Sequence, residues 1–88
     1  MRMNVKGTKK ITVGGIKYKI NLLDPVEWML IKRKIQNTVP IFSGQPDELK
    51  TCTIILREIV VEPAVKVDDF ESYGDLMKLI ELCIEAQN

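Results

Sequence analysis

The segment VVEPAVKVDDFESY (residues 60–73) decides the fold, because it interrupts a chain whose apolar residues otherwise recur at helical spacing. Pro63 prevents a helix from continuing through it and biases Glu62 towards an extended conformation. Asp68 and Ser72 are residue types that begin helices. The segment therefore predicts a corner between two amphipathic helices that fold back on one another.

The two helices beside this corner are predicted over residues 46–61 and 73–86. Pro46, followed by two acidic residues, is typical of a first helical turn. The later helix carries one apolar stripe, formed by Leu76, Leu79, Ile80, Cys83 and Ile84.

A third helix is predicted over residues 24–36, with Asp24 as its N-cap and Pro25 at its first position. It carries two apolar rows, made of Val26, Met29 and Leu30 and of Trp28, Ile31 and Ile35. That is more apolar surface than one stripe against a core requires. A core position is favoured for Trp28 over an exposed partner anchor.

Residues 8–22 predict a β-hairpin that precedes these helices. Apolar and polar residues alternate on both sides of Gly14 and Gly15, which supply the positive φ of a two-residue turn. An isolated hairpin is marginally stable, so its apolar face is expected to lie on the helices. The sequence thus predicts an α+β fold, with a flexible N-terminus (residues 1–7) and a single domain over residues 8–88.

Length and composition limit the chain to one small globular domain. Its 88 residues, 45% hydrophobic and 28% charged, leave no room for a second core and are unlike disordered chains. A core of this size supplies only about 3–5 kcal/mol, so a partner or a homo-oligomer is part of the expectation. No apolar run is long enough for a membrane span and no signal peptide is apparent, which predicts a cytoplasmic protein without membrane contact.

Little in the sequence indicates catalysis. The chain has no histidine, which is the commonest general base and metal ligand. Cys52 and Cys83 lack the spacing of metal or redox motifs and are interpreted as buried free thiols. We expect no enzyme activity, no metal site and no cofactor.

Charge is distributed unevenly along the chain. Residues 1–34 carry nine basic and two acidic residues, a net charge of +7, whereas residues 35–88 carry four basic and ten acidic residues, a net charge of −6. This polarity fits attraction of an acidic partner or head-to-tail pairing of copies. It equally fits two solvated surfaces without a partner.

Turn-forming residues predict a loop over residues 37–47, NTVPIFSGQPD. It contains two large apolar residues, Ile41 and Phe42. They either tuck the loop onto the core, which is the favoured interpretation, or form a docking tip.

The order of these features resembles a known family. ILREIVVEPAVKVDDFESYGDLMKLIELCIEAQ (residues 55–87) combines an apolar helix, a V-x-x-P-x-V segment, an acidic step with an aromatic residue and a closing amphipathic helix. The helix start NLLDPVEW (residues 21–28) after a hairpin fits the same pattern. Together they resemble the tail assembly chaperones of long-tailed bacteriophages and prophages, over about residues 8–86.

This resemblance implies a non-catalytic morphogenesis protein of the host bacterial cytoplasm. Such chaperones bind the tape measure protein and keep it soluble until the tail tube assembles. The resemblance also implies a longer, frameshifted form of the protein as a partner. Our hypothesis for the partner-binding surface comprises Trp28, Met29, Ile41 and Phe42.

Two other functions remain open at this point. One is a structural connector, baseplate or tail-completion subunit that stays in the virion. The other is weak nucleic-acid binding by the basic N-terminal third, in which only Tyr18 is interleaved as an aromatic residue.

Overall fold

The predicted hairpin is present in the computed structural model, which describes residues 5–37 and 47–87. Strands β1 (Val5–Val13) and β2 (Ile16–Leu23) pair antiparallel. Gly14 and Gly15 connect them with φ values of 58° and 80°, the left-handed conformation that a two-residue turn requires at both positions. β1 begins at Val5, so residues 5–7 belong to a strand where a flexible terminus was expected.

A third strand, which the sequence analysis missed, completes the sheet. β3 (Val60–Glu62) lies antiparallel to β2 and gives the order β1-β2-β3. Helix α2 (Glu48–Glu58) therefore ends three residues before the predicted position 61. The cause is a backbone hydrogen bond in which the Asn21 N–H donates to the Ile59 carbonyl at 2.8 Å. The Ile59 N–H still donates to the Ile55 carbonyl at 2.9 Å, but from the Ile59 carbonyl onwards the backbone bonds to the sheet.

The other helices begin at the predicted capping residues. Helix α1 (Pro25–Gln36) starts after Asp24, whose Oδ1 accepts the Glu27 N–H at 2.9 Å. Helix α3 (Tyr73–Gln87) starts after Ser72, whose Oγ accepts the Asp75 N–H at 3.3 Å. Each bond satisfies one backbone donor that the first helical turn leaves without a partner.

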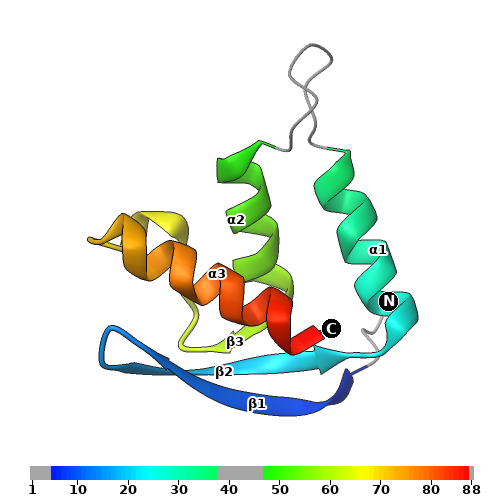
Figure 1. The fold of residues 1–88 in the computed structure, drawn as a ribbon, viewed down its shortest axis with the longest axis horizontal. Helices are drawn as coiled ribbons and strands as arrows, with labels where there is room; N and C mark the ends of the chain where they lie inside the picture. The colour runs from blue at the N-terminus through cyan, green and yellow to red at the C-terminus, as the bar shows by residue number, and fades with distance from the viewer. Residues whose placement is uncertain (1–4, 38–46, 88) are drawn as a thin grey trace.

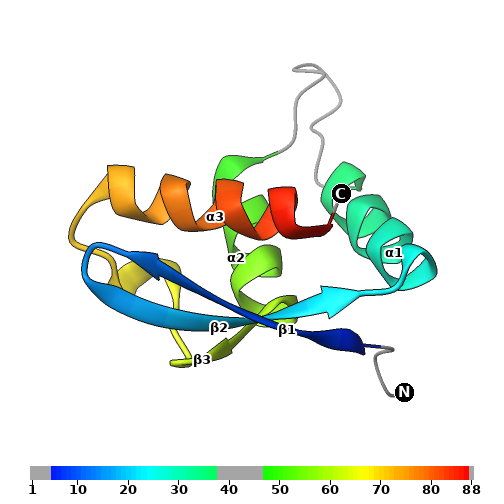
Figure 2. The same ribbon diagram turned by 60° about the horizontal axis from the view of Figure 1, so that its bottom comes forward.

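All three helices lie on one face of the sheet (Figure 1), and α3 runs along β2, from the hairpin turn towards the far end of the strand (Figure 2). Between these two layers lies one core. Its members with 0% exposure come from every layer, namely Ile20, Ile55, Ile59, Leu79 and Cys83. The predicted α+β class, with a hairpin packed on three helices in one small domain, is confirmed.

The segment between β3 and α3 follows the predicted corner. It contains a cis bond between Glu62 and Pro63 and a short 3-10 helix, η1 (Val67–Asp69). Phe70 then stacks on Tyr18 of β2, with ring centroids 6.4 Å apart and planes 15° from parallel. The corner is thereby fixed to the hairpin.

The far end of α3 is fixed to the same strand by Gln87. Its side chain accepts a hydrogen bond from the Leu23 N–H at 2.9 Å and donates to the Asn21 carbonyl at 2.8 Å. Both ends of α3 are therefore held against β2. Within residues 5–37 and 47–87, no helix has the length and apolar character needed to cross a membrane.

Candidate functional site

The four residues of the predicted partner surface have different positions. Trp28 is 7% exposed and lies in the core, as its favoured interpretation predicted, so it offers little surface to a partner. Met29 is 60% exposed. Ile41 and Phe42 lie outside the described residues. Of this set, the structure thus describes one residue at the surface.

Met29 belongs to an exposed apolar row along α1, here called the α1 row, together with Val26 and Leu30. The second apolar row of this helix faces inwards, with Trp28 and Ile31 buried. The surplus of apolar residues seen in the sequence therefore corresponds to a helix with one buried and one exposed apolar row. Three isolated side chains on a convex helix form a patch, whereas ligand and peptide sites are usually concave.

A concave apolar surface lies elsewhere, between α2, the 64–69 segment and the start of α3. It is an open groove of about 680 Å³ with an adjoining hollow of about 190 Å³. Leu49 and Val67 line both parts, so we treat them as one site, the α2–α3 groove. Leu56 and Val60 line it as largely buried residues, 4% and 8% exposed.

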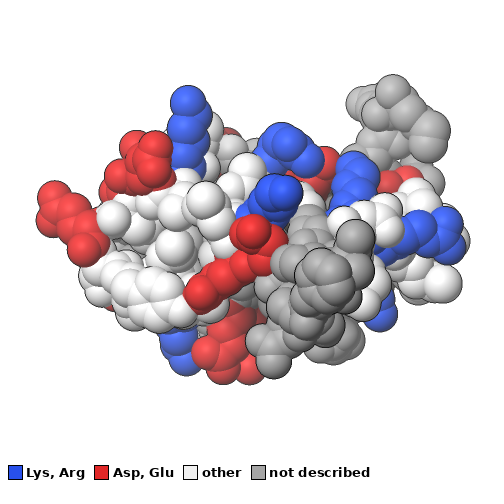
Figure 3. All heavy atoms as spheres, turned by 90° about the horizontal axis from the view of Figure 1, so that it is seen from above, with Lys and Arg blue, Asp and Glu red and all other residues white. Residues whose placement is uncertain are grey.

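The rim of the α2–α3 groove carries large exposed apolar side chains. Leu49 is 61% exposed and Tyr73 is 66% exposed. The Tyr73 hydroxyl donates a hydrogen bond to the Glu48 carboxylate, which joins the starts of α3 and α2. This hydrogen bond is the main cause that raises the pKa of Tyr73, and desolvation is the second. Viewed from above, the molecule shows an area of uncharged side chains with acidic and basic side chains beside it (Figure 3).

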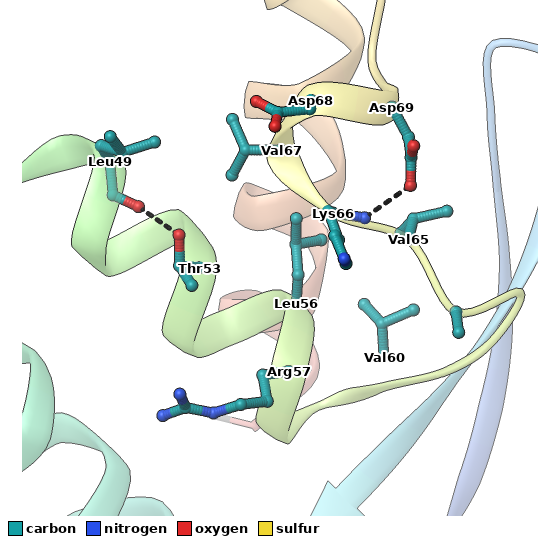
Figure 4. Close-up of a pocket in the computed structure, with 11 residues that line it drawn as sticks. Leu49, Thr53, Leu56, Arg57, Val60, Val65, Lys66, Val67, Asp68 and Asp69 are labelled. Atoms are coloured by element: carbon teal, nitrogen blue, oxygen red, sulfur yellow. Dashed lines mark hydrogen bonds between the residues drawn. The ribbon is translucent and has the colours of Figure 1, made fainter.

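Side chains from two elements meet in the main part of the groove (Figure 4). Thr53 and Arg57 come from α2, and Thr53 donates its hydroxyl hydrogen to the Leu49 carbonyl at 2.8 Å. On the opposite wall the Lys66 N–H donates to Asp69 Oδ2 at 2.8 Å, which holds η1 in place. From this wall Val67 points its apolar side chain towards α2, and Val65 also lines the groove. The groove is thus built to take apolar groups, with charge at its border.

The cysteines provide no reactive group at this site. Cys52 lines the smaller hollow but is 2% exposed, and Cys83 is 0% exposed; both are free thiols, as predicted. Burial raises the pKa of Cys83 from 9.0 to about 12. Burial, and to a smaller extent the negative charge of Glu48, raises the pKa of Cys52. Since the thiolate is the nucleophile, both side chains are inert near neutral pH.

This burial predicts slow thiol chemistry and an alkaline loss of stability. At pH 8 we expect a disulfide reagent to modify both thiols rapidly in denaturant and slowly in the native protein. The native Cys83 thiol stays protonated up to about pH 12, whereas the unfolded thiol ionises above its ordinary value of 9.0. Its stabilising contribution is therefore complete below pH 9.0 and declines between pH 9.0 and about 12. Urea titrations over this pH range measure the decline in the free energy of unfolding, which we expect to be smaller in Cys83→Ala. Rapid modification of the thiols in the native protein at pH 8 contradicts the prediction of slow thiol chemistry.

Three basic residues of the hairpin, Lys10, Lys17 and Lys19, lie on the outer face of the sheet. Tyr18 and Ile20 are buried beneath the helices, so Lys17 and Lys19 of the same strand point to the opposite face. In the β1–β2 register Lys10 is directly opposite Lys19, a like-charge pair that disfavours the sheet slightly. Tyr18 is 3% exposed, so it offers no ring face on which a base can stack.

Metal-binding groups are also absent from the part of the chain that the structure describes: no group of three or more His, Cys, Asp or Glu side chains there has an arrangement that holds an ion. The acidic residues near the corner instead act locally, as the Asp69 bond to the Lys66 backbone illustrates.

Comparison with protein-family models, with curated proteins and with solved structures finds no match to this chain. The assignment of the site therefore rests on its own residues. The partner surface predicted from the sequence does not include the α2–α3 groove, because its four residues belong to α1 and to the 37–47 loop. One signal was available: Leu49 and Val67 are apolar residues next to charged neighbours.

Proposed function

We propose that this protein is a non-catalytic tail assembly chaperone of a phage or prophage. In this role it binds the tape measure protein in the host cytoplasm and keeps it soluble until the tail tube assembles. The observation that carries the proposal is the α2–α3 groove, with Leu49 and Tyr73 exposed at its rim. The feature order of residues 8–86 supports the choice of client.

The groove suits such a client for physical reasons. A tape measure protein is long and helical, and an amphipathic helix that has no partner exposes an apolar stripe that aggregates. A hydrophobic groove binds such a stripe through side chains at i, i+3, i+4 and i+7. Met77, which lines the smaller hollow, adds an unbranched side chain that adapts to different partners.

Co-expression tests this function. The tape measure protein of the same phage or prophage is expressed in bacteria with and without the chaperone candidate, and its soluble fraction is measured. We expect the tape measure protein to precipitate alone and to remain soluble, and co-purify, with the candidate present. A tape measure protein that is equally insoluble in both cases contradicts the proposal.

Virion composition separates this function from a structural role. A chaperone leaves before the tail is complete, so we expect mass spectrometry of purified virions to detect this chain far below the level of tail subunits. A stoichiometric amount in the virion favours the connector, baseplate or tail-completion role instead.

A further inference from the structure

The two ends of the α2–α3 groove carry charges of opposite sign. Glu48 is the first residue of α2 and Arg57 lies in its last turn. In Figure 4, Asp68 and Asp69 lie on the side of Leu49, away from Arg57. In Figure 4 the Lys66 side chain points away from Asp68 and towards Val60, on the Arg57 side. At a rise of about 1.5 Å per residue, the span from the first residue of α2 to Arg57 is about 13 Å. The groove is therefore a short apolar channel with an acidic end and a basic end.

Neighbouring groups reduce this polarity without removing it. Glu58 lies 3.5 Å from the Arg57 guanidinium, but it also pairs with Lys34 at 3.0 Å, so the basic end keeps a cationic excess. The α2 dipole opposes the polarity with about half a charge at each end. That is less than the full charges of the side chains, so the net field along the groove keeps its direction.

A helix bound in this channel has its own dipole, with a positive N-terminus and a negative C-terminus. We propose that the groove orients a bound amphipathic helix parallel to α2, with its N-terminus at the Glu48 and Asp68 end and its C-terminus at the Arg57 and Lys66 end. This inference rests on the proposed function, because the occupant is a client helix, and adds the direction in which that helix lies.

The groove also sets the spacing of the client's apolar residues. Leu49 and Leu56 are seven positions apart on α2, which is about two turns. A parallel helix that follows this wall inserts side chains at i, i+4 and i+7 between α2 and the Val65–Val67 wall. The occupant is therefore a helix with a leucine-rich stripe of about two turns.

The test uses a designed peptide of about 15 residues with leucines at these spacings, neutral polar residues elsewhere and blocked ends. A nitroxide label is attached at its N-terminus or its C-terminus, and paramagnetic broadening of backbone amides is measured by NMR. We expect the N-terminal label to broaden amides near Glu48 and Asp68, and the C-terminal label to broaden amides near Arg57 and Lys66. Helix–charge interactions at both ends predict a preference of about three- to thirty-fold for this orientation.

Charge-neutralising variants test the cause. The triple variant Arg57→Gln/Lys66→Gln/Asp68→Asn is expected to lose most of the orientational preference while still binding the peptide. Lys17→Glu changes charge on the opposite side of the sheet and serves as the matched control, with the preference retained. Asp69 stays unchanged because it caps η1.

Each remaining outcome is decisive. Equal broadening of both ends by both labels, or the reversed pattern, overturns the orientation and leaves the groove as a binding site. Absence of peptide binding overturns the orientation together with the groove's role in the proposed function. If the peptide-free protein dimerises and Leu49→Glu abolishes the dimer, a second copy of the chain occupies the groove. This result also overturns the inference.

Discussion

Ile55→Ala is expected to leave the domain largely unfolded at room temperature. Ile55 is 0% exposed on the inner face of α2, in the core between the sheet and the helices. Replacing a buried isoleucine by alanine removes three carbons and leaves a cavity, at a cost of about 2–5 kcal/mol. A core of this size supplies only about 3–5 kcal/mol in total. Urea titration followed by circular dichroism measures the loss, with the midpoint displaced towards zero denaturant.

Leu49→Ala provides the matched control on the same helix. Its side chain is 61% exposed, so little apolar area returns to water, and surface substitutions usually change stability by less than about 0.5 kcal/mol. If Ile55→Ala unfolds cooperatively at nearly the wild-type urea concentration, the position of α2 against the sheet is wrong.

Leu49→Glu is expected to abolish retention of the tape measure protein while leaving the domain folded. The side chain forms the shared rim of both parts of the α2–α3 groove. A bound apolar helix has to desolvate the introduced carboxylate, and burying an unpaired charge is strongly unfavourable. Because Leu49 lies where the two parts of the groove meet, we expect the introduced charge to cost about 2 kcal/mol of binding free energy, which is about 30-fold in affinity. The soluble fraction of co-expressed tape measure protein, and its co-purification, report the effect.

Met29→Glu distinguishes the groove from the α1 row. Met29 is 60% exposed, close to the 61% of Leu49. The two variants therefore introduce the same charge on an equally exposed helix surface. We expect Met29→Glu to retain the client. If it loses the client and Leu49→Glu does not, the partner surface lies on α1, where the sequence hypothesis placed Met29.

Local signals in the sequence were sufficient for most of the elements. The Gly14–Gly15 turn, Asp24 and Ser72 act through backbone geometry and hydrogen bonds within a few residues, so their effect can be predicted without tertiary structure. Both glycines have positive φ and both capping side chains accept the expected N–H groups. Trp28 was likewise assigned to the core from the spacing of its row, and it is buried.

Features that depend on distant partners were not predictable in the same way. Val60 fits the apolar face of a helix that continues to Pro63, and only its pairing with Ile20, forty positions earlier, makes it a strand residue. A three-residue strand gives too short an alternation to detect in sequence. The α2–α3 groove has the same origin, since its walls come from α2 and from a segment whose position depends on the Tyr18–Phe70 contact.

The long-range position of β3 has a consequence for synthesis on the ribosome. The hairpin and α1 leave the exit tunnel before β3, the second neighbour of β2, and before α3, the helix that runs along β2. Until residues 60–87 emerge, the edge of β2 that pairs with β3 stays open and the inner face of the hairpin has no α3 above it. At translation rates of about 5–20 residues per second, this exposed intermediate lasts for seconds. A protein proposed to shield a client's apolar surface therefore passes, during its own synthesis, through a stage in which it needs the same protection.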